Sequence, residues 1–146
     1  MFVRNTLLPV LSTAAVIANS ALAQDERPTD TASLTIELNA ASDNAGGCTL
    51  SFLIANGLDD DITQVVYETV IFDTDGQVER LTLLDFGALP AGRPRVRQFT
   101  LADTSCDQIG RVLVNGADTC EVEGLDEITC MERLDLKSRT DIEVLG

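Results

Sequence analysis

The residue types that most often perform catalysis are scarce in this chain. It contains no histidine and a single lysine, Lys137, so neither a Ser-His-Asp nor a Cys-His arrangement can be built. Lys137 lies between Leu136 and Ser138 in a strand-like pattern, which indicates a solvated strand residue. Paired carboxylates can hydrolyse glycosidic bonds, but we expect such a cleft to be lined with aromatic residues, and the chain has no tryptophan. We therefore expect no catalytic residue, no cofactor and no enzymatic activity.

Four cysteines could either bind a metal ion or form disulfides: Cys48, Cys106, Cys120 and Cys130. A structural zinc site favours close Cys-x-x-Cys pairs or added histidines, and the chain has neither. An even number of cysteines in an exported chain is typical of disulfides. Three connectivities of two bridges are possible. Cys48–Cys106 with Cys120–Cys130 is favoured, because the second pair closes a short local loop.

A run of three acids, Asp59, Asp60 and Asp61, is a weak candidate for a Ca²⁺ site, with Asp43 or Asp118 as further ligands from other loops. Calcium takes six to eight oxygen ligands that converge on one point. Three consecutive side chains cannot all face the same ion. The favoured interpretation is a solvated loop in which the aspartates promote a turn.

The stretch "IFDTDGQVERL" also resembles a calcium loop at first sight. An EF-hand loop needs glycine at its sixth position and glutamate at its twelfth. When Asp73 is counted as the first position, Gly76 is fourth and Leu84 is twelfth. Asp-Gly between two alternating apolar runs is instead a strong hairpin signal. We predict a tight turn between two strands here.

Three arginines, Arg93, Arg95 and Arg97, occupy alternate positions in a chain of net charge −14. One interpretation places them in a hairpin around "GALPAG" in which Asp85 faces Arg95 as an ordinary cross-strand charge pair. That register also pairs Leu83 with Arg97, Leu81 with Phe99 and Glu79 with Leu101. The alternative is that the three arginines form a positive surface that recognises carboxylates of a partner, a role that suits the planar guanidinium group.

The N-terminus predicts export. One arginine, an uncharged apolar stretch and a small-residue box that ends at Ala23 follow the plan of a secretory signal peptide. The apolar core, residues 7–18, is shorter than the roughly 20 residues that span a bilayer. We expect a cleaved signal peptide (residues 1–23), a flexible leader (24–32) and one domain (33–146) in the bacterial periplasm or outside the cell. The strong negative charge argues against nucleic-acid binding, and no later segment suits membrane insertion.

The rest of the chain shows the two-residue periodicity of β-strands. Leu34, Ile36 and Leu38 alternate with polar residues, and Cys48 has the same parity as the apolar residues that follow it, which indicates a buried bridge between sheets. The expected strands cover residues 33–38, 48–56, 62–72, 77–84, 95–101, 110–115, 130–138 and 140–145, with turns at 116–120 and within 121–129. This pattern predicts an all-β, two-sheet antiparallel immunoglobulin-like sandwich of seven or eight strands, stapled by two disulfides.

The middle of the chain, residues 50–101, resembles the FxLYD type of small immunoglobulin-like sandwich found in exported bacterial proteins. The resemblance rests on turn and strand-end residues: Asn56, Ile71, Phe72, Asp73, Gly76, Leu89, Pro90, Gly92 and Phe99. It implies a sandwich fold and a periplasmic or surface setting, and it brings no catalytic residues.

These observations together predict a non-enzymatic binding or accessory module of the cell envelope, whose partner is another envelope or secreted protein. The sheet edge formed by the first strand, near "SLTIEL", is a candidate for accepting a partner strand. The alternative function is a secreted small-ligand or weak Ca²⁺-binding protein that uses the acidic loops. The sequence leaves the oligomeric state open.

Overall fold

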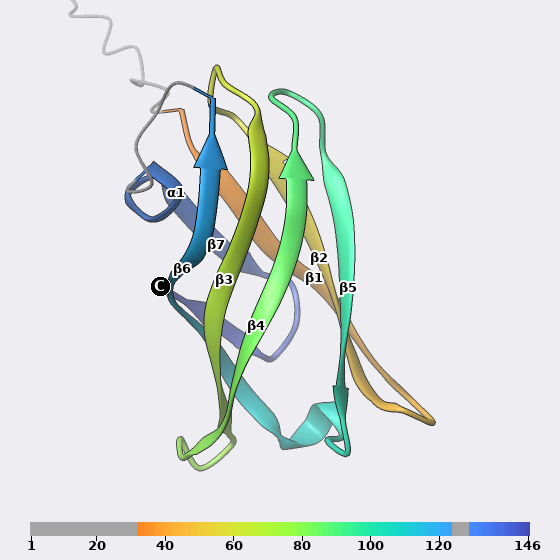
Figure 1. The fold of residues 1–146 in the computed structure, drawn as a ribbon. Coiled ribbons are helices and arrows are strands. Elements are labelled where there is room, and N and C mark those ends of the chain that lie inside the picture. The colour runs from red at the N-terminus through yellow and green to blue at the C-terminus, as the bar shows by residue number, and fades with distance from the viewer. Residues whose placement is uncertain (1–31, 124–128) are drawn as a thin grey trace, which may run out of the picture.

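The computed structural model describes residues 32–123 and 129–146, which form a two-sheet β-sandwich (Figure 1). It has eight strands and two short helical turns. Their bounds are β1 (Leu34–Asn44), β2 (Gly47–Asn56), β3 (Ile62–Asp73), β4 (Val78–Leu89), β5 (Arg95–Ala102), η1 (Cys106–Gln108), β6 (Ile109–Val122), α1 (Thr129–Glu132), β7 (Leu134–Ser138) and β8 (Glu143–Leu145). The immunoglobulin-like sandwich expected from the sequence is confirmed.

The first sheet has the strand order β5-β2-β1-β7 and the second has the order β4-β3-β6-β8. The β1–β2 and β3–β4 connections are hairpins within a sheet, whereas every later strand joins the sheet opposite its predecessor. The arrangement departs from the purely antiparallel expectation at its C-terminal end, because β7 runs parallel to β1 and β8 runs parallel to β6. The first strand, β1, lies between β2 and β7. It is therefore not a free edge, and the prediction that it could accept a partner strand was wrong.

The apolar periodicity explains how the two sheets pack. Leu34, Ile36 and Leu38 of β1 are at most 1 % exposed. Across the antiparallel register Ile36 pairs with Ile54 and Leu38 with Phe52, while Leu34 pairs with the buried Asn56. Central strand β3 presents Tyr67 and Ile71 to the same core, both at most 1 % exposed. Each strand contributes one face to a single hydrophobic interior, as a sandwich requires.

The turn at Asp73 is confirmed as the link between β3 and β4. The Asp73 carboxylate accepts hydrogen bonds from the backbone N–H groups of Asp75 and Gln77, at 2.9 and 2.8 Å. Gly76 has a φ of 82°, the left-handed conformation that glycine adopts without steric cost. The Asp73 carboxylate, which suggested a calcium ligand in the sequence, thus binds backbone N–H groups of its own turn.

Both disulfides have the connectivity that the sequence favoured, Cys48–Cys106 and Cys120–Cys130. Cys48 is fully buried in β2, but its partner lies in η1, the connection between β5 and β6. The bridge therefore ties the first sheet to a crossing connection and does not join two facing strands as expected. The second bridge links β6 to α1. The buried Tyr67 hydroxyl donates a hydrogen bond to the Cys130 carbonyl, at 2.8 Å, and so reinforces that corner.

Three local expectations were wrong. The predicted turn at residues 116–120 is part of β6, which continues along β3 through several register shifts that absorb the irregular residues. Cys130 belongs to α1, and the strand expected over 130–138 begins at Leu134. Ala32, expected in a flexible leader, packs against the core.

The predicted signal peptide and the rest of the predicted leader lie outside the described residues. None of the helical turns within residues 32–123 and 129–146 has the length and apolar character needed to cross a bilayer.

Candidate functional site

The three arginines singled out in the sequence lie on one side of the sandwich, where β4 and β5 are the edge strands of the two sheets (Figure 1). We call this side, with the arginines on and before β5, the arginine flank. The predicted hairpin between β4 and β5 is wrong: β5 pairs with β2, and β4 pairs with β3. Arg95 lies opposite Ile54, and Asp85 binds the Gln64 side chain at 2.7 Å instead of an arginine.

The cause of this difference is the bend after β4, which carries the chain to the other sheet. Asn56, 2 % exposed, holds the bend: its side-chain amide donates to the Leu89 carbonyl at 2.7 Å and its own carbonyl accepts from the Gly92 N–H at 2.8 Å. The Asn56 side-chain oxygen also accepts from the Leu58 N–H, at 2.9 Å. One buried amide therefore joins the β2–β3 loop to the β4–β5 bend.

Arg97 connects the two sheets. Its side chain has the same parity as Phe99 and Leu101, so it leaves β5 toward the inner side and reaches the edge of β4. The guanidinium donates to the carbonyls of Phe86 and Ala88, at 2.8 and 3.2 Å, and to the neighbouring Val96 carbonyl at 3.1 Å. These bonds cover part of the exposed edge of β4, a common way to prevent unwanted strand pairing.

Arg80 makes a second connection near the other end of the same side. From β4 its guanidinium donates to the Ala102 carbonyl at 2.9 Å and to the Thr104 hydroxyl at 3.3 Å. Sequence reasoning did not identify Arg80. Its role depends on β4 and β5 being edge strands of different sheets, which no local pattern indicated.

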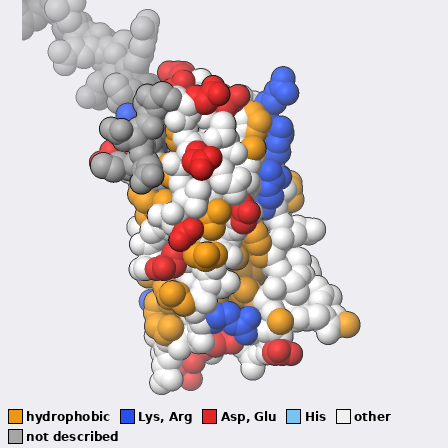
Figure 2. All heavy atoms as spheres, viewed as in Figure 1, with side chains coloured by type: hydrophobic (Ala, Val, Ile, Leu, Met, Phe, Trp, Pro, Cys, Tyr) orange, Lys and Arg blue, Asp and Glu red, His pale blue; other side chains and the backbone are white. Residues whose placement is uncertain are grey.

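The guanidinium groups of Arg93 and Arg95 are more available to a partner than those of Arg97 and Arg80. Arg93 is exposed, and the only hydrogen bond that the Arg95 guanidinium makes to the described residues reaches the adjacent Pro94 carbonyl. Among residues 32–123 and 129–146 the ion pairs involve Arg111, Lys137 and Arg139, so no described carboxylate forms an ion pair with Arg93, Arg95 or Arg97. Figure 2 shows the resulting column of basic side chains along the side where β5 runs.

Apolar side chains adjoin these arginines on the outer surface. Val96 and Leu53 face one another across β5 and β2 and are 59 % and 37 % exposed. A separate apolar group on the outer surface of the second sheet comprises Val78, Leu81 and Leu83. The arginine flank therefore offers both positive charge and uncovered apolar area.

The acidic candidates do not converge. Among the described residues, Asp59, Asp60 and Asp61 form no group whose oxygens lie close enough to share an ion. The Asp61 carboxylate accepts the Ala91 N–H at 2.8 Å, and the Asp60 carbonyl accepts from Asn56. The one compact set of candidate metal-binding groups in the described chain combines Asp43 with Cys48 and Cys106. The sulfurs of Cys48 and Cys106 are joined in a disulfide, so neither is available as a thiolate ligand.

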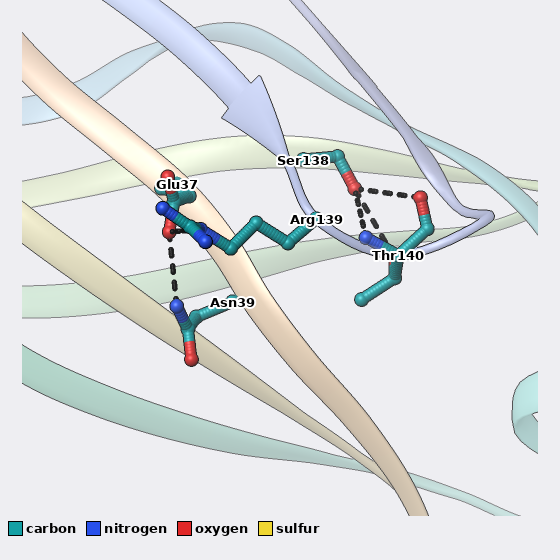
Figure 3. A network of polar contacts seen from close by, with 5 residues as sticks. All are labelled: Glu37, Asn39, Ser138, Arg139 and Thr140. Atoms are coloured by element: carbon teal, nitrogen blue, oxygen red, sulfur yellow. Dashed lines mark hydrogen bonds and ion pairs between the residues drawn. The ribbon is translucent and has the colours of Figure 1, made fainter.

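A polar network lies away from the arginine flank, where β1 meets the end of β7 (Figure 3). Glu37 accepts from Asn39 at 2.9 Å and from Arg139 at 2.8 Å. The Asn39 hydrogen bond, helped by Arg139, lowers the pKa of Glu37. Arg139 and Thr140 also line a hollow of about 630 Å³. Since Arg139 is already paired with Glu37, we interpret this network as one that stabilises the junction of β1 and β7.

In comparisons with known proteins, no family model, no curated protein and no solved structure matches this chain. The resemblance to FxLYD domains therefore stays a prediction. The candidate site rests on the geometry of the arginine flank.

Proposed function

We propose that this protein is a non-enzymatic protein-interaction module of the bacterial periplasm or cell exterior, which binds acidic partners through the arginine flank. One observation carries the proposal. Arg93, Arg95 and Arg97 lie together on one side of a strongly acidic protein, and no described carboxylate pairs with them. A positive surface on such a protein attracts a negatively charged partner and orients its approach.

Two further features support an exported setting. The chain forms two disulfides, which persist in oxidising compartments. Its first 23 residues have the pattern of a signal peptide. Mass spectrometry of the protein isolated from its host tests this part directly: the expected N-terminus is Gln24, and a chain that retains residues 1–23 would contradict it.

The partner is best sought by photo-crosslinking in living cells. A photoreactive amino acid placed at Val96, on the arginine flank, should form an adduct with an acidic envelope or secreted protein. The variant Arg93→Gln/Arg95→Gln should lose this adduct. Arg97 is left unchanged in this variant because its guanidinium connects the two sheets.

The matched control is Arg133→Gln/Lys137→Gln, which removes the same charge at the β7 side of the first sheet, the edge opposite β5. This control should keep the adduct. Equal yields from the native chain and the Arg93→Gln/Arg95→Gln variant would refute the proposal. An adduct that the control also loses would show that total charge matters and the arginine flank does not.

A further inference from the structure

The free edge of β5 is defined by the register of its neighbour, β2. The hairpin between β1 and β2 has a two-residue loop, Ala45 and Gly46, so the closing pair Asn44 and Gly47 must exchange both backbone hydrogen bonds. Backbone groups then alternate along β2. Those of odd-numbered residues point toward β1, as the Gly57 N–H bond to the Ser33 carbonyl shows. Those of even-numbered residues point toward β5.

This alternation fixes which backbone groups of β5 have no partner strand among the described residues. Even-numbered β2 residues pair with Leu101, Phe99, Arg97 and Arg95, so these four direct their backbone groups toward β2. The backbone groups of Val96, Gln98 and Thr100 point to the open side. Within the described chain, the Val96 carbonyl accepts from the Arg97 guanidinium and the Ala102 carbonyl accepts from Arg80. The Val96 N–H and the backbone N–H and carbonyl groups of Gln98 and Thr100 therefore remain open to a further strand.

The side chains around this open segment differ on its two faces. The side chains of Arg95 and Arg97 lie on the inner side of β5, and the Arg97 guanidinium has more N–H groups than its three bonds to the described residues use. Val96 lies on the outer parity beside the exposed Leu53. A strand placed next to β5 would therefore meet positive charge on one face and apolar area on the other.

From this geometry we infer that the partner adds an extended, acidic segment to the free edge of β5, with carboxylates at alternate positions facing Arg95 and Arg97 and apolar side chains facing Val96 and Leu53. The inference rests on the proposed function and specifies how the same site works. Main-chain hydrogen bonds would give affinity, and the alternating side chains would give specificity. The neighbouring edge of β4 is less suitable, because Arg97 covers the carbonyls of Phe86 and Ala88.

The test uses a capped eight-residue peptide that alternates glutamate and valine, with a glutamine–valine peptide as the control for charge. Amide hydrogen exchange is followed by NMR on the full folded protein. At a peptide concentration ten times the Kd, the amides of Val96, Gln98 and Thr100 should exchange about tenfold more slowly. The amides of Arg97, Phe99 and Leu101, already directed toward β2, should change little. The glutamine–valine peptide should bind more weakly.

Methylation of the peptide nitrogens tests strand pairing separately from charge. Only one edge of an added strand can pair with β5, so methylation of one alternate set of residues should abolish binding and methylation of the other set should be tolerated. An antiparallel strand pairs through its valine residues and a parallel strand through its glutamate residues. Tolerance of both methylated sets, or loss of binding with both, would overturn strand addition.

The outcomes separate the two proposals. If the peptide binds, loses binding to the Arg93→Gln/Arg95→Gln variant and protects none of the three open amides, strand addition is wrong and the proposed function stands. If it binds that variant as well as the native chain and protects the amides, strand pairing is supported and the role of charge fails. No binding at millimolar peptide overturns strand addition, and the crosslinking experiment then decides the proposed function alone.

Discussion

The Nε of Arg97 donates a 2.8 Å hydrogen bond to the backbone carbonyl of Phe86 and so joins an edge strand of one sheet to an edge strand of the other. A second guanidinium nitrogen reaches the Ala88 carbonyl. This contact has two consequences on the same side of the molecule. It covers part of the β4 edge, and on the free edge of β5 the Arg97 guanidinium occupies only the Val96 carbonyl, so the rest of that edge stays open for pairing.

The Arg97→Lys variant should be less stable than the native protein. Lysine keeps the charge, but it has no planar fork that can bind two carbonyls at once. We expect the free energy of unfolding to fall by about 2 kcal/mol, the value typical of hydrogen bonds to charged groups. Urea unfolding measures the change. Arg95→Lys is the control and should change stability by less than about 0.5 kcal/mol. Equal losses in the two variants would contradict the role given to Arg97.

Asn56→Ala should be more damaging than most polar substitutions in this chain. It removes the donor to the Leu89 carbonyl and the acceptor of the Leu58 N–H in a buried position. Unsatisfied buried polar groups cost about 1–3 kcal/mol each, so we expect a loss near 3 kcal/mol in urea unfolding.

The control for Asn56 is Asn39→Ala, which removes one hydrogen bond to Glu37 at an exposed position. Its effect on the free energy of unfolding should stay within about 0.5 kcal/mol. A small effect at both positions would show that the β4–β5 bend forms without the Asn56 amide.

Tyr67 should make stability depend on alkaline pH. Burial raises the pKa of its hydroxyl above the ordinary value of 10.0, so the folded protein retains a proton that the unfolded chain releases. The contribution is fully present below pH 10 and is lost as the pH rises above it. Because the chain has a single tyrosine, tyrosinate absorbance should appear together with unfolding, as followed by circular dichroism.

Tyr67→Phe separates this effect from other alkaline changes. It should lose about 1 kcal/mol at neutral pH, because the hydrogen bond to the Cys130 carbonyl disappears. It should then lose less additional stability than the native protein above pH 10. Tyrosinate that forms while the native circular dichroism signal is unchanged would contradict the burial argument.

The two disulfides should contribute unequally. Cys48–Cys106 closes a loop with a sequence separation of 58, and Cys120–Cys130 one of 10. Loop-closure entropy predicts a loss of about 4 kcal/mol when both cysteines of the first bridge are replaced by alanine and about 3 kcal/mol for the second. Urea unfolding of the two double variants tests this order. The reverse order would show that the corner at Tyr67 and α1 matters more than loop length.

Much of the fold follows from local chemistry that the sequence displays. Alternation placed Leu34, Ile36 and Leu38 in the core, and the parity of Cys48 matched that of the buried residues of β2. The short interval between Cys120 and Cys130 identified the disulfide pairing. These predictions succeeded because period-two burial and short-loop closure depend on neighbouring residues alone.

The candidate site was only partly predictable. The alternate spacing of Arg93, Arg95 and Arg97 was visible, as was the parity that Arg95 and Arg97 share with Phe99 and Leu101. The partners of these arginines were not visible, because the Pro90-Ala91-Gly92 bend reveals that the chain turns but not which sheet the next strand joins. The same limit explains why the role of Arg80 was missed and why β1 was taken for an edge.

The sequence by itself determined that this chain forms disulfide-linked strands with one apolar face each, since side-chain alternation and cysteine spacing are properties of the chain. Only the tertiary structure decided which strands are edges, and hence that the arginines line an open side of the sandwich. Strand order depends on pairing between segments far apart in the chain. In this protein the bend between β4 and β5 is held by the buried Asn56, whose side-chain amide donates to the Leu89 carbonyl and whose backbone carbonyl accepts from the Gly92 N–H.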